Sequence, residues 1–499
     1  MKSYKTLLFI LCIAVGLALM AAFFPREGVY IYDVLFRFPA LSEVMGPEPE
    51  AMEEEGEEED AAADTLSPEE LMEQRLAALH ASRDSEFVAY IAKSPTRFYM
   101  PEDDAAYLDP LFQALIEAQK RPTRIMHYGD SQIEGDRMTG VLREYFQDTF
   151  GGSGPGLAPA VQTLGSATVT VTTRPELPHY MFFGSSSFHA DHNRYGPLAQ
   201  VAQVTDSATF EVACHGGKSY PHCRSFRRLS VLLSGSGSLT VPLSDSTSVE
   251  LTSSLDSAYH GLRIASATLP SAVSRATVTA RGNMEVYGLM LDGAGGVSVD
   301  NIAMRGVSGT LFTSIGRESL APFFSQQDVS LIILQYGGNS VPYLKDSRGI
   351  SNYKRQLMAQ ISLFRQMSPS SCILLIGPSD MATVDGEEMK TYPRLPEIVD
   401  SLRAAAVESG AAFWNMYRAM GGRGSMVRWV EADPQLAGED YIHFTPRGAR
   451  KMSELLCQTF DFYYKYYRFR HGLDQETLPE DSVANDTTRT DTLHRPVVQ

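Results

Sequence analysis

The sequence predicts an α/β protein: a three-layer α/β/α domain with a parallel sheet, interrupted by an inserted β-sandwich domain. Short apolar runs have the length and composition of strands buried on both faces, at residues 328–336, 371–377 and 411–417. Helix-like stretches at 353–367 and 395–408 alternate with these runs and would cover the sheet. Residues 164–296 differ from both patterns and turn rich in Ser, Thr, Val and Gly.

That Ser- and Thr-rich region alternates apolar and polar residues, as at 167–172 and 239–243. Short strands separated by turn residues at regular spacing are typical of a β-sandwich. Residues 276–280 and 284–289 are expected to form its closing hairpin. We therefore expect a β-sandwich at 164–296, inserted between two halves of the α/β domain at 76–163 and 297–470.

The N-terminus predicts the compartment. Lys2 and Lys5 precede an uncharged apolar run of 18 residues at 7–24, which is long enough for a marginal transmembrane helix. No clear small-residue cleavage site follows, so an uncleaved signal anchor at 1–25 is favoured over a cleaved signal peptide. The positive residues lie before the helix, which predicts a single-pass inner-membrane protein with the body of the chain in the periplasm.

Between the anchor and the α/β domain, residues 26–75 predict a juxtamembrane segment and an acidic linker. Residues 48–70 contain twelve Asp or Glu and no Lys or Arg, against a net charge of −17 for the chain. Such a charge block is typical of a solvated, extended spacer. No basic face suited to nucleic acid is present, and the polar stretch at 471–499 predicts a disordered tail.

The cysteines suggest two kinds of site. Cys372 and Cys457 lie in apolar surroundings and are expected to be buried thiols. Cys214 and Cys223 bracket a loop that also contains two histidines, which could make a metal site. In an oxidising compartment, a local disulfide between these two cysteines is the plainer interpretation.

A serine nucleophile is indicated by the strand-like stretch at 124–128, which leads into a Gly-Asp-Ser turn that presents Ser131. A serine hydroxyl needs a nearby neutral imidazole to take its proton. Asp440 and His443 lie three positions apart, close enough for the carboxylate to fix the imidazole tautomer while the ring faces a serine. His127, inside the strand, is expected to be a packing residue and not a member of this triad.

The same chemistry needs donors for the oxyanion of a tetrahedral intermediate, each contributing roughly 3 to 4 kcal/mol. The candidates are the backbone N–H groups of Ser131 and Gly306 and the side-chain amide of Asn339. Glycine at 306 would leave room for a substrate to approach the backbone. Taken singly, each of these residues could instead form a turn or cap a helix, and their joint occurrence favours function.

The chain order Ser131, Gly306, Asn339, His443 resembles that of the SGNH (GDSL-type) hydrolase family, which is named for these four residues. The resemblance covers about 122–162 and 297–465, and a β-domain inserted between the first two blocks is similar to bacterial peptidoglycan O-acetylesterases, where the inserted module resembles carbohydrate-binding domains. The family mechanism implies no metal and no cofactor. Ser340 departs from the family, in which Asp often follows the asparagine, and this puts a supporting hydrogen bond in question.

These observations predict an extracytoplasmic serine esterase that hydrolyses O-acetyl esters on a cell-wall or surface polysaccharide. Its partners would be an acylated glycan and the inner membrane. One alternative is an O-acetyltransferase of the same superfamily, which would pass the acetyl group from an acyl-serine to a sugar and take it from a membrane partner. A second alternative is a glycan-binding protein with an inert hydrolase domain.

Overall fold

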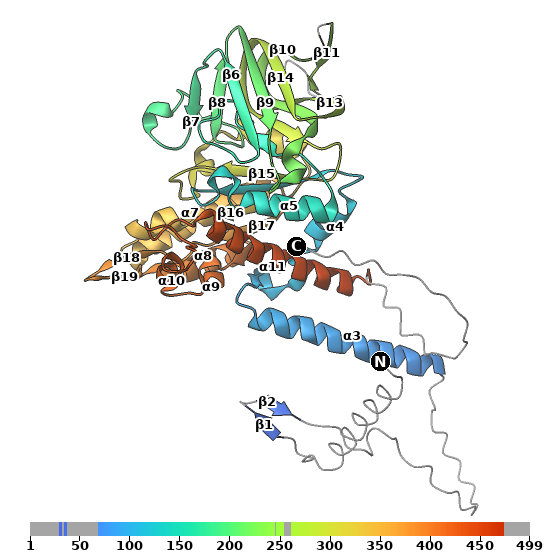
Figure 1. The fold of residues 1–499 in the computed structure, drawn as a ribbon, viewed down its shortest axis with the longest axis vertical. Helices are drawn as coiled ribbons and strands as arrows, with labels where there is room; N and C mark the ends of the chain where they lie inside the picture. The colour runs from blue at the N-terminus through green and yellow to red at the C-terminus, as the bar shows by residue number, and fades with distance from the viewer. Residues whose placement is uncertain (1–28, 32–33, 37–67, 245, 254–260, 474–499) are drawn as a thin grey trace, which may run out of the picture. The chain divides into compact units, whose positions relative to one another are not determined.

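The structure is a computed structural model that describes residues 29–31, 34–36, 68–244, 246–253 and 261–473 (Figure 1). The chain divides into two compact units, 1–77 and 78–499. In the first unit, β1 (Val29–Ile31) pairs antiparallel with β2 (Val34–Phe36). The predicted anchor, most of the acidic linker and nearly all of the predicted tail lie outside the described residues. Among the helices that are described, none is long and apolar enough to span a membrane.

The second unit contains the predicted parallel sheet. Its six strands follow the order β15, β4, β16, β17, β20, β3, and only the edge strand β3 runs antiparallel to its neighbour. Their bounds are β15 (Val297–Ala303), β4 (Thr123–Gly129), β16 (Val329–Gln335), β17 (Cys372–Ile376), β20 (Ala412–Trp414) and β3 (Phe98–Tyr99). The three apolar runs predicted as buried strands therefore form β16, β17 and β20, which confirms those strands.

Helices cover both faces of this sheet. Successive side chains of a strand point to opposite faces, so each strand contributes to two cores. On β4, Met126 and Tyr128 pack in the core beneath α6, α7 and α8, while Ile125 packs in the opposite core beneath α4, α5 and α11. This confirms the three-layer α/β/α architecture. The helices are α3 (Pro68–Lys93), α4 (Asp109–Glu117), α5 (Thr139–Phe150), α6 (Ala321–Gln326), α7 (Ser347–Met367), α8 (Leu395–Glu408), α9 (Met416–Met420), α10 (Ser425–Val430) and α11 (Pro446–Arg470).

The inserted region is an antiparallel β-domain with its own core (Figure 1). Its strands are hydrogen-bonded into one ten-stranded sheet, in which the long strands β10 and β14 each pair with several shorter ones. The strands are β5 (Gly156–Ala158), β6 (Val169–Arg174), β7 (His179–Met181), β8 (Gln200–Val204), β9 (Ser207–Cys214), β10 (Phe226–Ser244), β11 (Thr247–Glu250), β12 (Thr252–Ser253), β13 (Arg263–Val273) and β14 (Arg275–Asp292). Because β5 pairs with β14, this sheet begins before residue 164, the boundary expected from composition.

The predicted closing hairpin at 276–280 and 284–289 is wrong, since both segments belong to the single strand β14. Gly282 lies within this strand opposite Gly237 of β10, and both have left-handed φ angles of +126° and +151°. A Cβ at either position would collide with backbone of the opposite strand. The glycines thus allow close backbone approach inside a continuous pair of strands, where composition suggested a turn.

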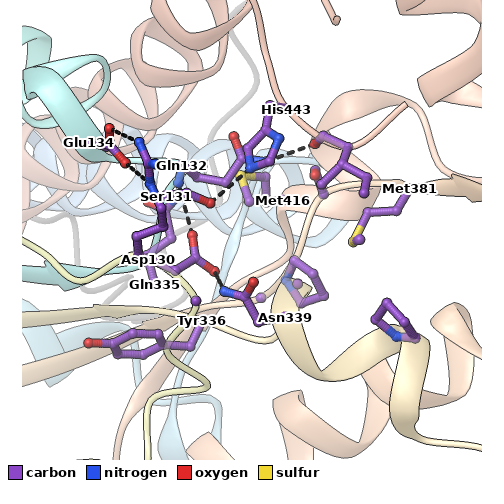
Figure 2. Close-up of a pocket in the computed structure, with 18 of the residues that line it drawn as sticks. Asp130, Ser131, Gln132, Glu134, Gln335, Tyr336, Asn339, Met381, Met416 and His443 are labelled. Carbon is purple, nitrogen blue, oxygen red and sulfur yellow. Dashed lines mark hydrogen bonds and ion pairs between the residues drawn. The ribbon is translucent and has the colours of Figure 1, made fainter. Parts of the chain in front are cut away.

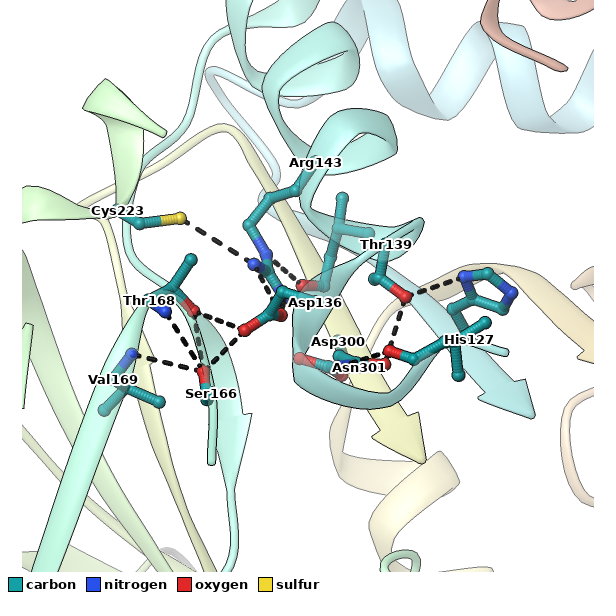
Figure 3. Close-up of polar contacts among 12 residues, drawn as sticks. His127, Asp136, Thr139, Arg143, Ser166, Thr168, Val169, Cys223, Asp300 and Asn301 are labelled. Carbon is teal, nitrogen blue, oxygen red and sulfur yellow. Dashed lines mark hydrogen bonds and ion pairs between the residues drawn. The ribbon is translucent and has the colours of Figure 1, made fainter. Parts of the chain in front are cut away.

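Buried charges join the β-domain to the parallel sheet. Arg124 on β4 donates to Asp292, the last residue of β14, at 2.5 Å and to Asp300 on β15 at 2.6 Å. Nearby, Asp136 accepts from Arg143 of α5 at 3.2 Å and also from hydroxyls of the β-domain, including Thr168 at 3.0 Å (Figure 3). Arg143 of the α/β domain and hydroxyls of the β-domain therefore donate to the same buried carboxylate, that of Asp136.

The predicted disulfide between Cys214 and Cys223 is wrong, because both are free thiols. The Cys223 sulfur is instead 3.8 Å from a guanidinium nitrogen of Arg143, which donates to it (Figure 3). Burial raises the pKa of Cys223 to about 11. Within the described ranges, no cluster of three or more His, Cys, Asp or Glu side chains is placed to hold a metal ion. Cys372 and Cys457 are buried free thiols, as expected.

Candidate active site

The nucleophile turn follows β4 directly. The Asp130 side chain accepts the backbone N–H of Gln132 at 2.9 Å, which closes a tight turn around Ser131. Arg137 then fixes the turn from the far side, since its guanidinium donates to the carbonyl of Ser131 at 2.5 Å and to that of Glu134 at 3.0 Å. These contacts hold Ser131 at the carboxyl end of a central strand, where open α/β sheets place their sites.

The structure brings the three predicted triad residues together. Ser131 Oγ lies 2.8 Å from His443 Nε2, and His443 Nδ1 lies 2.7 Å from Asp440 Oδ2. Figure 2 shows the serine and the imidazole facing each other. Because a carboxylate accepts at Nδ1, that nitrogen carries the proton and Nε2 is left to accept the serine hydroxyl. This is the arrangement that a serine nucleophile and its general base require.

Asp440 is held in its charged form. Partial burial alone would raise its pKa, but hydrogen bonds from the backbone and ring of His443 and from the backbone of Ile442 outweigh that effect and lower it. Its Oδ1 accepts both backbone N–H groups at 3.0 Å. Tyr441, between the acid and the histidine, adopts a left-handed φ of +56°, a conformation uncommon for a side chain of its size. The hydrogen bonds that the Asp440 carboxylate accepts therefore stabilise the conformation of the loop that carries His443.

Gln132 ties this histidine loop to the nucleophile turn, a role that the sequence alone did not suggest. Its side-chain amide donates to the carbonyl of Ile442 at 2.8 Å, across 310 positions of sequence. Other bonds hold the neighbouring carbonyls, since Tyr441 O accepts from Ala382 N at 3.1 Å and His443 O from Gly438 N at 2.8 Å. Gln132 is thus a positioning residue for the base. In the sequence, its position next to Ser131 was the feature that could have indicated this role.

Replacing Gln132 by leucine should lower kcat about tenfold with a smaller effect on KM, because losing one hydrogen bond of roughly 1 to 1.5 kcal/mol loosens the alignment of serine and histidine. Steady-state kinetics on a small acetyl ester would measure this. Gln366→Leu, at an exposed position on α7, is the matched control. A rise in KM at constant kcat would show that Gln132 binds substrate instead.

Two of the predicted oxyanion donors are free to act. Within the described part of the chain, neither the backbone N–H of Ser131 nor that of Gly306 donates to another protein group. Gly306 has a left-handed φ of +79°, and a Cβ built there would meet no atom within 4 Å. The glycine is therefore needed for its backbone conformation, and it also leaves the cavity beside the serine open.

Asn339 differs from the expectation. It lies in η8 (Gly338–Tyr343), and its amide nitrogen donates to Asp130 Oδ2 at 3.0 Å and to the carbonyl of Val307 at 3.1 Å (Figure 2). Both partners are acceptors, so the nitrogen is correctly oriented and its two hydrogens are occupied. Donation to an oxyanion would require the amide to exchange or share one of these bonds. Asn339 is therefore held by hydrogen bonds to Asp130 and Val307, although the residue that follows it is Ser340 and not Asp.

Asp130 has an unusual environment for a carboxyl group. It is buried, and burial raises its pKa to about 6, although the N–H of Gln132 and the nearby charges of His443 and Arg137 oppose that rise. The folded protein therefore binds more protons here than an unfolded chain does between about pH 4 and pH 6. It follows that the contribution of Asp130 to the free energy of unfolding falls as pH rises through that window.

The Asp130→Asn variant should reveal this linkage. Its free energy of unfolding, measured by denaturant titration, should rise relative to wild type as pH increases from about 4 to about 7, since the variant lacks the ionisation. If the difference in the free energy of unfolding between the two proteins stayed constant across this range, the pKa of Asp130 would not be raised in the folded protein, which would contradict this account.

His127 is fully buried within β4, the strand that precedes the nucleophile turn. Its Nε2 is 3.1 Å from Gln335 Oε1, and its Nδ1 is 3.0 Å from the hydroxyl of Thr139, whose oxygen also lies 3.0 Å from Asn301 Oδ1 (Figure 3). Burial lowers its pKa to about 4. It is a buried, hydrogen-bonded packing residue, as expected, and it makes no contact with Ser131.

Ser131 and His443 open onto a cavity of about 480 Å³. This volume is within the range of small-molecule sites, roughly 300 to 1,000 Å³. An ion pair between Arg305 and Glu134 lies along its wall, with nitrogen and oxygen 2.5 Å apart. Other lining residues are Gln335, Tyr336, Pro342, Tyr343, Pro378, Met381, Met416 and Ile442.

Residues 270–451 match the model of the GDSL-like Lipase/Acylhydrolase family. The chain carries a GDSL-like acylhydrolase domain. The matched range includes Gly306, Asn339, Asp440 and His443, and Ser131 precedes it because the inserted β-domain separates the first block from the others. The geometry of the GDSL-like domain and its family together identify an ester hydrolase. No curated protein sequence matches the chain.

A solved peptidoglycan O-acetylesterase shares the fold of this acylhydrolase. It superposes with a TM-score of 0.59 and 20% identity, covering 73% of this chain and 98% of its own. A putative GDSL-like lipase from Parabacteroides merdae gives 0.27 and 16%, with 33% and 74% covered. An acetyl xylan esterase gives 0.25 and 13%, with 32% and 80% covered.

Proposed function

We propose that the chain hydrolyses O-acetyl esters on a cell-wall or surface polysaccharide outside the cytoplasm. The observation that carries this proposal is the hydrogen-bonded series Asp440, His443, Ser131 at the mouth of an open cavity, beside two unengaged backbone N–H groups. Acetylated peptidoglycan is the first substrate to consider, because a solved structure that covers 73% of this chain is that of a peptidoglycan O-acetylesterase. The apolar run at 7–24, preceded by Lys2 and Lys5, supports the compartment.

In the acylation step, Ser131 Oγ attacks the acetyl carbonyl carbon while its proton passes to His443 Nε2. The carbonyl oxygen becomes an oxyanion that receives hydrogen bonds from the backbone N–H groups of Ser131 and Gly306. The bond between the carbonyl carbon and the sugar oxygen then breaks, and His443 returns the proton to that oxygen. The products are a free sugar hydroxyl and an acetyl ester on Ser131.

Deacylation repeats these steps with water. His443 takes a proton from the water, whose oxygen attacks the acetyl carbon, and the proton then returns to Ser131 Oγ as the ester bond breaks. Acetate leaves and the serine is restored. Asp440 stays ionised throughout and stabilises the imidazolium form of His443 in each step.

The test is acetate release by the full-length protein from O-acetylated peptidoglycan and from acetylated xylan, with and without an added glycan acceptor. Acetate released into water, and lost in Ser131→Ala, is the expected result. Acetyl groups that move onto the acceptor while little acetate appears would replace this proposal with the transferase alternative. Absence of any Ser131-dependent turnover would overturn it.

A further inference from the structure

The cavity beside Ser131 is much larger than the acyl group assigned to it. An acetyl group has only a few atoms heavier than hydrogen, each about the size of a water molecule, and water occupies about 30 Å³. The cavity of about 480 Å³ therefore has most of its volume available for the alcohol part of the ester. Side chains along that part of the cavity decide which alcohols bind.

Tyr343 stands out among the lining residues. It is the last residue of η8, the segment that also carries Asn339, and it lines the same cavity as Ser131. Its side chain is 81% exposed, the largest value among the large apolar and aromatic side chains of the described chain. Its hydroxyl makes no hydrogen bond within the described residues. The ring is therefore not packed into the core of the domain.

The neighbours of Tyr343 along the cavity are compact and apolar. Pro342 precedes it, and Pro378, Met381 and Ile442 line the same cavity. Ligand-binding cavities are lined mainly by apolar and aromatic side chains, which contact the ligand directly. A pyranose ring presents a face of C–H groups with hydroxyls at its edge, and such a face packs on an aromatic ring while the hydroxyls remain in water. A long acyl chain would instead need an enclosed apolar tunnel.

We infer that Tyr343 is a specificity-determining residue that forms a stacking platform for a sugar ring of the substrate. The inference rests on the proposed function and deepens it, because it assigns recognition of the glycan to the catalytic domain itself. The ring of Tyr343 would hold the sugar that bears the acetyl group, or its neighbour, while Ser131 attacks the ester.

The experiment compares kcat/KM on an acetylated oligosaccharide with kcat/KM on p-nitrophenyl acetate, in the full-length protein and its variants. Tyr343→Ala should lower the ratio of the two constants about tenfold relative to wild type, chiefly through a higher KM for the oligosaccharide. Tyr343→Phe, which keeps the ring, should restore most of the ratio. Tyr90→Ala, which removes another exposed tyrosine on α3 far along the chain from the cavity residues, is the control and should keep the wild-type ratio.

The outcomes separate this inference from the proposed function. An unchanged ratio in Tyr343→Ala, with Ser131-dependent hydrolysis of both substrates, would overturn the platform and leave the esterase function in place. An equal loss in Tyr343→Phe and Tyr343→Ala would also overturn it, since the ring would then not be the recognised feature. Failure of the wild-type protein to deacetylate any glycan would overturn the proposed function and this inference together.

Discussion

The Ser131→Ala variant is expected to lose ester hydrolysis by at least about a thousandfold in kcat. Alanine cannot form the acyl-enzyme, and the proton acceptor His443 Nε2, 2.8 Å from the serine oxygen, then has no nucleophile to activate. The remaining backbone N–H groups could still polarise a carbonyl, so a small residual rate over the uncatalysed reaction is expected. Initial rates on p-nitrophenyl acetate would measure the loss.

Two controls make this result specific. The thermal midpoint of Ser131→Ala should match that of wild type, because the change removes one oxygen from a half-buried side chain. Ser351→Ala, at an exposed position on α7, should keep full activity. Retention of a tenth or more of the activity in Ser131→Ala would show that another group is the nucleophile.

The second large effect concerns stability. Arg124→Leu should lower the free energy of unfolding by about 3 to 5 kcal/mol, because it leaves Asp292 and Asp300 buried without their cation. The Arg124 side chain is only 4% exposed, and the carboxyl of Asp300 is fully buried. Burial already raises the pKa of Asp300 above its usual value in spite of Arg124, so loss of the arginine would force that carboxyl to take up a proton or water to enter.

Denaturant titration monitored by tryptophan fluorescence would measure this effect. Arg121→Leu is the matched control, because Arg121 pairs with Asp328 in an exposed ion pair and its loss should change the free energy of unfolding far less than the loss of Arg124. Equal effects of the two substitutions would contradict the account of Arg124 as the buried link between the β-domain and the parallel sheet.

The sequence was sufficient for those parts of the fold that depend on local pattern. Apolar runs and helical spacing predicted β16, β17, α7 and α8, because burial on both faces of a parallel sheet leaves a continuous apolar run. The strands of the β-domain were harder to predict, because a glycine such as Gly282 can occur either in a turn or where two strands approach closely. Only the partner strand distinguishes these cases, and pairing is a property of the folded chain.

The same limit applies to the site. Ser131, Asp440 and His443 could be named from the sequence, because their chemistry prescribes the residue types and their order along the chain resembles that of the SGNH family. The engagement of Asn339 by Asp130 could not, since it depends on which acceptors lie within reach after folding. The Cys214 and Cys223 pair shows the reverse case, in which nearness in sequence suggested a bond that the fold does not make.

The most direct test of the central claim is covalent labelling with a serine-reactive phosphonate ester, followed by intact mass measurement and peptide mapping. The account predicts one adduct per chain, located on Ser131, absent in Ser131→Ala and formed much more slowly in His443→Gln. An adduct on a different residue, or hydrolysis that continues at the wild-type rate after Ser131 is fully labelled, would contradict it.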